Sequence, residues 1–367
     1  MCNKQLYFSL YEGLVSFHTV EYRLEAGRYS YSDLRKRAFA QKAATGAITY
    51  TEDHSLYVRL RQGVVLKICD YDTPLLFIKI NPRILVEEDH SYLGIFHATA
   101  ENIEKIYSKA SAIVQEYVPG YSLEDASLCR VDLCLNITCN QPDALIQLIA
   151  CLKRCDWRSQ YQTTEFSAHT RNAEEKNKHS FRILSKHFSL TVYDKLFERT
   201  QRSSLEPEHP DGLLRVEFGL QDEMAIGYYL HDAAMTDREK LIFLAENSGN
   251  ILSRRLRGLF GSGVHLPLET VHMLVDRQPH LKSKTRRRMN LLAENLFYCK
   301  SADQAKRMFF LELPQKVDQS RCYTKILKRF SELEIHPVPV STDWNKPLPS
   351  LAMIVEKLLC CGQQTHS

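Results

Sequence analysis

Three short segments of this chain share one pattern, an alternation of apolar and polar residues. They are Arg130–Ile137, Ser189–Lys195 and Leu213–Leu220. Successive side chains of a β-strand point to opposite sides of a sheet, so this alternation is typical of strands that bury one face and leave the other polar. The three segments therefore predict neighbouring strands of one sheet with an apolar face and a charged face.

The polar faces of these segments carry the side chains on which the functional expectation depends. One tyrosine, one lysine, two arginines, two carboxylates and one amide fall there: Tyr193, Lys195, Arg130, Arg215, Asp132, Glu217 and Asn136. A carboxylate inside a sheet is costly unless it is paired, bound to a metal or exposed to water. Simple ion pairs, Arg130 with Asp132 and Arg215 with Glu217, are the ordinary alternative to a functional site.

A tyrosine beside cations and acids is suited to attack a phosphodiester. A phenol has a pKa near ~10 and must give up its proton to bond to phosphorus. Lys195 would lower that pKa or stabilise the charge of the phosphorane. Mg²⁺ or Mn²⁺ would find oxygen ligands in Asp132, Glu217 and Asn136. The reaction leaves a 5′-phosphotyrosine link and a free 3′ hydroxyl, so the strand can be rejoined without ATP.

The rest of the chain predicts an α+β fold. Short strands are expected over Gln5–Leu10, Leu56–Leu60, Val64–Cys69 and Leu75–Ile80. Helical spacing runs from Ala98 to Tyr117, Pro142 opens a second helix, and helical spacing prevails beyond about Asp237. We therefore expect an antiparallel sheet domain with packed helices over residues 1–236, followed by a mostly helical region over 237–367 for DNA binding or dimerisation.

Two basic clusters lie in the predicted helical region. The first contains Arg254 and Arg255, and the second contains Lys282, Lys284, Arg286, Arg287 and Arg288. Basic runs are more often solvated faces than binding sites, but the second cluster precedes an amphipathic helix and could lie along a phosphate backbone. The net charge of +4 permits a nucleic-acid partner without requiring one.

The composition predicts a soluble, cytoplasmic protein that does not associate with a membrane. The 367 residues contain no signal peptide and no long apolar stretch. The 11 cysteines are an odd number, which favours reduced thiols over a disulfide framework.

Four motifs resemble, in order and spacing, the plasmid rolling-circle replication initiators of the staphylococcal type. They also resemble the replication initiation factors of conjugative transposons and the related phage and plasmid replication proteins. The motifs are Ile78–Pro82, Leu128–Leu133, Leu190–Arg199 and Leu214–Glu217. The likeness spans roughly residues 75 to 222.

The resemblance implies an α+β nickase domain and a role for each matching residue. Tyr193 would be the nicking nucleophile, and Asp132 and Glu217 would belong to an acidic metal centre. The scissile phosphate would be surrounded by three cations, namely Lys195, Arg130 and Arg215. The substrate would be a single-stranded or hairpin replication origin, and the partners would be a second copy of the chain and a host helicase.

The sequence differs from the family at two places. The family often has an aspartate where Asn136 stands and an acid where Lys79 stands, and Lys79 would instead contact DNA or replace part of the metal's charge. A non-catalytic DNA-binding regulator on the same scaffold is therefore the alternative. A tyrosine recombinase fits less well, because its chemistry requires several arginines and a histidine around a tyrosine near the end of a helical domain.

Overall fold

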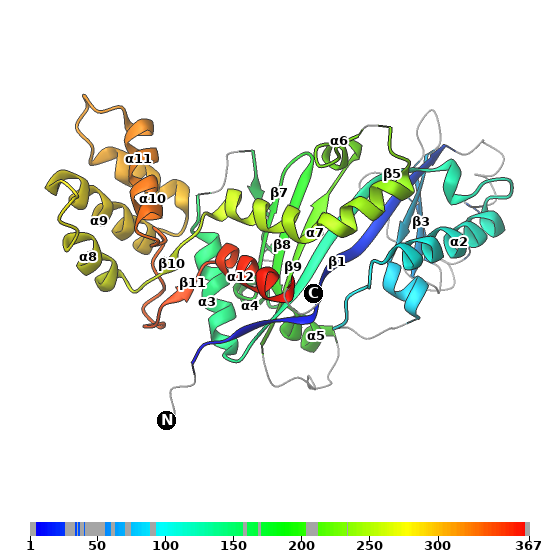
Figure 1. Cartoon of the computed structure of the whole chain (residues 1–367), viewed down its shortest axis with the longest axis horizontal. Helices are drawn as coiled ribbons and strands as arrows, with labels where there is room; N and C mark the ends of the chain where they lie inside the picture. The colour runs from blue at the N-terminus through cyan, green and yellow to red at the C-terminus, as the bar shows by residue number, and fades with distance from the viewer. Residues whose placement is uncertain are drawn as a thin grey trace.

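The computed structural model describes residues 5–25, 34, 36, 40, 56–59, 63–69, 75–88, 93–156, 160–167, 170–202, 212–232 and 234–363. Within them, nine strands form one antiparallel sheet in the order β2-β3-β4-β1-β5-β9-β8-β7-β6 (Figure 1). The strands are β1 Phe8–Glu25, β2 Leu56–Arg59, β3 Val64–Cys69, β4 Leu75–Ile80, β5 Ser127–Cys139, β6 Gln162–Thr163, β7 Ser180–Leu184, β8 Phe188–Asp194 and β9 Gly212–Leu220. The chain is an α+β protein, as predicted.

Helices cover the apolar face of this sheet. They are α3 (Pro142–Lys153), α7 (Asp237–Phe260) and α12 (Leu351–Gln363), which contact the central strands or one another. At Gly212 on β9, an added Cβ would lie 2.7 Å from the Leu145 side chain and 3.0 Å from Pro142 Cα of α3, so the strand approaches the helix too closely here for a side chain of its own. The core therefore lies between the sheet and this helical layer, and the opposite face is left for polar residues.

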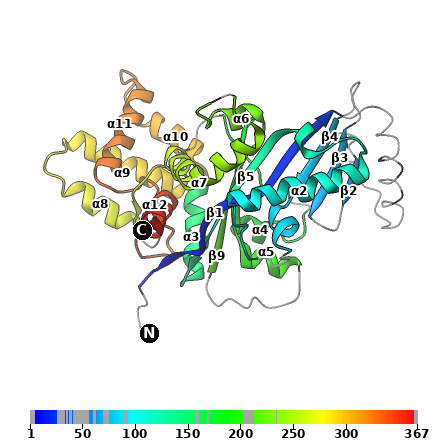
Figure 2. The ribbon, with the colours of Figure 1, turned by 45° about the vertical axis from the view of Figure 1, so that its right-hand side comes forward.

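The other helices border the sheet or pack beside it. They are η1 Arg83–Glu87, α2 Ala100–Tyr117, η2 Leu123–Asp125, α4 Ala173–Lys178, α5 Lys195–Arg202, α6 Glu223–Gly227, α8 Leu268–Asp276, α9 Ser283–Tyr298, α10 Ala302–Leu311 and α11 Gln319–Glu332. Helices α8 to α11 form a bundle at one end of the molecule, beyond the short pair β10 (Val264–His265) and β11 (Leu348–Pro349) (Figures 1 and 2). No helix among the described residues combines the length and apolar character needed to cross a membrane.

The change from strands to helices falls where helix α7 begins. Thr236 and Glu239 form a capping box, in which the Glu239 carboxylate accepts a hydrogen bond from the Thr236 backbone at 2.7 Å. The helices beyond this point are not all alike. Helices α7 and α12 pack on the sheet, whereas α8 to α11 pack mainly among themselves.

Strand positions were predicted closely where apolar and polar residues alternate without a break. Strands β3 and β4 have the predicted limits, and β2 begins at the predicted residue, whereas Leu60 lies outside the described residues. The prediction for β1 was wrong, because this strand runs for 18 residues rather than ending at Leu10. Its pairing with β5 shifts register three times, between Leu10 and Val15, Phe17 and Thr19, and Glu21 and Tyr22. Each shift breaks the period of two that marks a strand in a sequence.

Candidate active site

The register of the sheet brings the predicted site residues to one face. Tyr193 on β8 lies opposite Arg215 on β9, which in turn lies opposite Asn136 on β5. Glu217 follows two residues after Arg215, and Asp132 occupies the same face of β5. All of these except Asn136 line a cleft of about 1080 Å³ on the side of the sheet away from α7.

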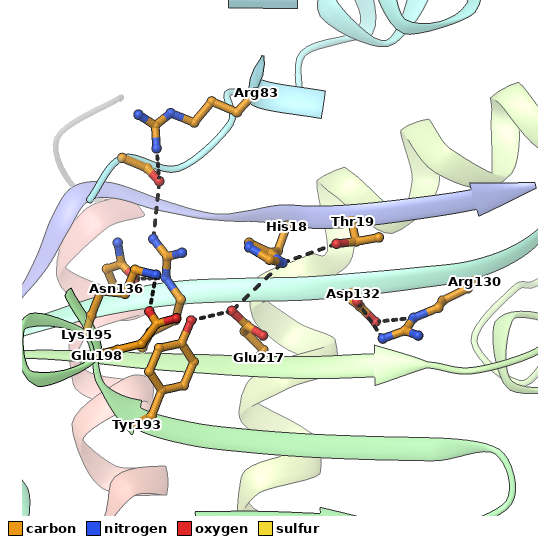
Figure 3. A network of polar contacts seen from close by, with 12 residues as sticks. His18, Thr19, Arg83, Arg130, Asp132, Asn136, Tyr193, Lys195, Glu198 and Glu217 are labelled. Atoms are coloured by element: carbon orange, nitrogen blue, oxygen red, sulfur yellow. Dashed lines mark hydrogen bonds and ion pairs between the residues drawn. The ribbon is translucent and has the colours of Figure 1, made fainter. Parts of the chain in front are cut away.

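The hydroxyl of Tyr193 donates a hydrogen bond to Glu217. The oxygen atoms are 2.8 Å apart, and the two side chains point toward each other across neighbouring strands (Figure 3). Burial raises the pKa of Tyr193 far above its ordinary value, and the negative charge of Glu217 raises it further. The phenol therefore keeps its proton at neutral pH, and Glu217 is the group placed to receive it.

Glu217 itself is held in the charged form. Burial would raise its pKa, but the neighbouring His18 and Arg215 and the hydrogen bond from Tyr193 outweigh burial, so the pKa of Glu217 lies below its ordinary value. His18 Nδ1 lies 3.9 Å from the same carboxylate oxygen that accepts from Tyr193. A nucleophile and a base are thus in direct hydrogen-bond contact, with an imidazole close to the base.

The guanidinium of Arg215 is held in place by hydrogen bonds to Asn136 and to two backbone carbonyls. Its Nε donates to Asn136 Oδ1 at 2.7 Å, and its Nη2 donates to the carbonyls of Leu93 and Gly94 at 3.2 and 3.3 Å. Asn136 also donates to the Leu93 carbonyl at 2.6 Å and is fully buried. Asn136 therefore positions Arg215. The ion pair between Arg215 and Glu217, which the sequence left open as an alternative, is not among the ion pairs of the described residues.

Lys195 reaches the site from a helix rather than from the strand that was predicted. Strand β8 ends at Asp194, whose Oδ1 accepts hydrogen bonds from the backbone N–H groups of Leu196 and Phe197, both at 3.0 Å, and so starts α5. Lys195 Nζ nevertheless lies 5.4 Å from the centre of the Tyr193 ring and donates to Glu198 at 2.5 Å. Burial, and then the charge of Arg215, lower the pKa of Lys195, while Glu198 opposes them.

Arg130 and Asp132 form the ion pair that the sequence suggested. Two parallel hydrogen bonds of 3.0 and 2.9 Å join the guanidinium to the carboxylate, which is 6% exposed (Figure 3). A bidentate pair of this kind is among the stronger polar contacts in proteins. Both oxygens of the Asp132 carboxylate therefore accept hydrogen bonds from Arg130, the cation that occupies the place a metal ion would take.

Gly219 allows Asp132 to lie across β9. A Cβ at position 219 would lie 2.7 Å from Asp132 Oδ1 and 2.5 Å from Ser189 Oγ, closer than real contacts allow.

We expect Gly219→Ala to lower the free energy of unfolding by about 1–3 kcal/mol, measured by urea denaturation. Gly258→Ala is the matched control, since a Cβ there in α7 meets nothing within 4 Å and should be neutral or stabilising. Equal stability of Gly219→Ala and the parent would contradict this account of the site.

The predicted metal ligands do not form a ligand set. Among the residues that the structure describes, no three His, Cys, Asp or Glu side chains are arranged to hold one metal ion. Asp132 is bound to Arg130, Glu217 to Tyr193, and Asn136 to Arg215. Mg²⁺ is commonly held by one or two carboxylates and several waters, but here it would have to displace the bidentate Arg130 from Asp132 and the Tyr193 hydroxyl from Glu217, so the donor set as arranged does not fit the ion. The divalent cation stays an untested prediction.

The predicted DNA-contacting residues lie in three places. Lys79 is exposed on β4 and pairs across the sheet with Glu21, which is opposite Arg130. Lys79 therefore extends the charged face that carries Tyr193. Arg254 and Arg255 lie on α7, over the apolar face of the sheet.

The guanidinium of Arg255 contacts aromatic side chains of the protein. Its guanidinium carbon lies 4.4 Å from the centre of the Phe188 ring and 5.5 Å from that of Phe218, and it donates to the hydroxyl of Tyr161. The second basic cluster lies at the start of α9, where Lys282, Lys284 and Arg287 are exposed and Arg286 and Arg288 are half-buried. Neither cluster belongs to the cleft lining, so the structure does not bring these cations together with Tyr193.

Sequence reasoning missed the contributions of β1 and of the segment after β4. His18 lies at the register shift between Phe17 and Thr19, so a strict period of two would not have assigned its face. Arg83 Nη1 donates to the Gly94 carbonyl at 2.6 Å, the same carbonyl that accepts from Arg215. The available signal in the sequence was an arginine directly after Asn81–Pro82, the end of one of the four motifs.

No protein-family model and no curated protein matches the sequence. Among solved structures, the chain is similar to a rolling circle replication initiator protein from Geobacillus stearothermophilus. The two share 9% sequence identity, and the similarity covers 70% of this chain and 86% of that chain with a TM-score of 0.31. At this TM-score the likeness decides nothing about the chemistry of this chain, which depends on the geometry of the cleft.

Proposed function

We propose that this protein is a rolling-circle replication initiator that cuts one DNA strand through Tyr193 and later rejoins it. The observation that carries the proposal is the 2.8 Å hydrogen bond from the Tyr193 hydroxyl to a charged carboxylate in a cleft lined by cations. The motif resemblance supplies the biological role. A homodimer and a host helicase stay predictions from that resemblance.

The proposed reaction is an exchange of one phosphodiester for another. The Tyr193 oxygen forms a bond to phosphorus while its proton passes to Glu217, and the bond between phosphorus and the 3′ oxygen breaks. The 3′ oxygen takes up a proton from water and leaves as a free hydroxyl, and the 5′ phosphate stays on Tyr193. Rejoining is the reverse reaction, in which the 3′ hydroxyl loses its proton to water and attacks the phosphotyrosine, while Glu217 returns its proton to the Tyr193 oxygen.

Cations of the protein would stabilise the charge that develops on the phosphorane. Arg215 is 3% exposed and is fixed by Asn136 and two backbone carbonyls, so it does not need to reorganise during the reaction. Lys195 is 5% exposed and lies beside the Tyr193 ring. Charged donors in a site with little water act more strongly than the same groups in solution.

A selection for covalent capture tests this function without knowledge of the origin. The full-length protein is incubated with single-stranded oligonucleotides that carry a randomised central segment, and DNA that survives a denaturing wash is sequenced. We expect an SDS-resistant complex that is enriched in one sequence. Sequence-specific binding without any covalent product would instead support the non-catalytic regulator, for which the engagement of Asp132 by Arg130 is the favouring observation.

Removing divalent metal ions tests whether the positive charge at the phosphate comes from Arg215 and Lys195 or from a bound cation. The donor set of the cleft predicts that EDTA changes the yield of covalent product by less than about twofold, because Arg215 and Lys195 carry the positive charge. The yield is measured on denaturing gels with the selected oligonucleotide, with and without EDTA. A loss of roughly a hundredfold that Mg²⁺ or Mn²⁺ restores would contradict this and favour the cation that the resemblance implies.

A further inference from the structure

An exposed aromatic residue stands at the β6–β7 side of the cleft. Phe166 is 46% exposed and follows β6, and it lines the same cleft as Tyr193. Among the described lining residues it is the large apolar side chain with the greatest exposure. A single exposed aromatic is common on protein surfaces, so its surroundings decide whether it has a role.

The backbone of Phe166 is held in place by one side chain. Asn177 on α4 accepts a hydrogen bond from the Phe166 N–H at 2.9 Å and donates one to the Phe166 carbonyl at 3.2 Å. The carbonyl of Asn177 in turn accepts from Lys153 of α3. This double contact holds the backbone at Phe166, so less of the protein's conformational freedom is lost when a ligand contacts the ring.

Two cations lie on the same side of the cleft. Lys176 Nζ is 5.5 Å from the centre of the Phe166 ring, and Arg182 is exposed on β7. Both line the cleft, and in the described part of the chain neither forms an ion pair with a carboxylate. An aromatic face beside cations is the arrangement by which proteins bind single-stranded nucleic acid, with bases stacked on rings and phosphates near positive charge.

The register connects this group to the tyrosine. Ser180 on β7 lies opposite Tyr193, and Arg182, two residues further along, lies opposite Thr191 on the same face. Arg182 is therefore a diagonal neighbour of Tyr193. The Thr164 N–H donates to the Arg182 carbonyl, so the chain after β6 runs antiparallel to β7, from Arg182 toward Ser180 and Asn177, where Phe166 is held. A strand whose phosphate sits at Tyr193 would therefore have Phe166 on the Ser180 side and Arg182 beside it on the same face.

We propose that Phe166, Lys176 and Arg182 form a subsite for single-stranded DNA. One base flanking the cut phosphate stacks on Phe166, while Lys176 and Arg182 contact the backbone. The choice of a DNA strand rests on the function proposed above, but the binding itself needs no cleavage. Duplex DNA keeps its bases stacked on one another and offers none to Phe166, so this subsite selects an unpaired strand.

Binding of a fluorescent oligothymidylate of about 15 nucleotides tests the subsite. All variants carry Tyr193→Phe, so that covalent capture does not distort the equilibrium. We expect Phe166→Ala to raise the Kd roughly 5- to 150-fold, since that is the effect of losing one base–aromatic stack, and Phe166→Trp to stay within about twofold of the parent. Lys176→Gln and Arg182→Gln should each reduce the slope of log Kd against log salt by about 0.7.

Tyr298→Ala is the matched control, because it removes an aromatic that is 76% exposed on α9, outside the cleft lining. It should leave binding unchanged. Equal Kd values for Phe166→Ala and its parent, at equal thermal midpoints, would overturn the subsite, as would equally tight binding of a duplex of the same length. A Phe166-dependent Kd in these variants, together with no covalent product from the protein that retains Tyr193, would support the subsite and contradict the proposed nicking.

Discussion

Replacing Tyr193 by phenylalanine is expected to abolish the covalent protein–DNA product, a loss of at least about a thousandfold, because the substitution removes the nucleophilic oxygen. The ring stays in place, and the substitution removes the hydroxyl with its hydrogen bond to Glu217. Binding of single-stranded DNA should therefore change by less than about twofold, as for the loss of a contact that the bound ground state does not use. The product is measured as SDS-resistant label on a denaturing gel.

The position of the label tests the polarity of the cut. A 5′-phosphotyrosine holds the fragment on the 3′ side of the cut, so a 3′-end label should migrate with the protein and a 5′-end label should be released. Tyr228→Phe is the control, because it removes the same atom from a tyrosine that is 69% exposed on the surface. An undiminished covalent product in Tyr193→Phe would show that another group attacks the phosphate.

The parts of the fold that were predicted share a simple physical origin. The apolar residues of β5, β8 and β9 face the helical layer, so burial on one side imposes an alternation that can be read directly. Pro142 at the start of α3 likewise marks a helix by its fixed backbone angle. Strand β1 escaped prediction because its bulges are stabilised by pairing with two distant strands, β4 and β5.

The sequence predicted which side chains share one face of the sheet, but it did not predict which hydrogen bonds they form there. Alternation placed Tyr193, Glu217 and Asp132 on one side of the sheet, which the structure confirms. It could not indicate that Arg215 would turn to the carbonyls of the loop at residues 93 and 94, because that loop reaches the sheet only through tertiary folding. Nor could it show that capping by Asp194 would move Lys195 into a helix.

These contacts change the expected role of Glu217. The sequence suggested a metal ligand, whereas the geometry offers a carboxylate that accepts directly from the attacking hydroxyl. Glu217→Gln keeps the size of the side chain and an oxygen that can accept from Tyr193, but it cannot take a proton. We expect the rate constant for covalent attachment to fall about 10²- to 10⁴-fold, with little change in DNA binding. Single-turnover kinetics with the 3′-labelled oligonucleotide measure it.

The pH dependence distinguishes a general base from a merely structural carboxylate. Because the pKa of Glu217 is lowered and that of Tyr193 is raised, the pair holds one proton, on Tyr193, throughout the neutral range. The parent rate should therefore be flat between about pH 6 and 8 and should fall only in acid, where Glu217 becomes protonated. In Glu217→Gln the proton must leave to solvent, so the residual rate should climb about tenfold per pH unit. Glu165→Gln removes another carboxylate of the cleft lining and should keep the flat profile. A flat profile in Glu217→Gln would mean that Glu217 only positions Tyr193.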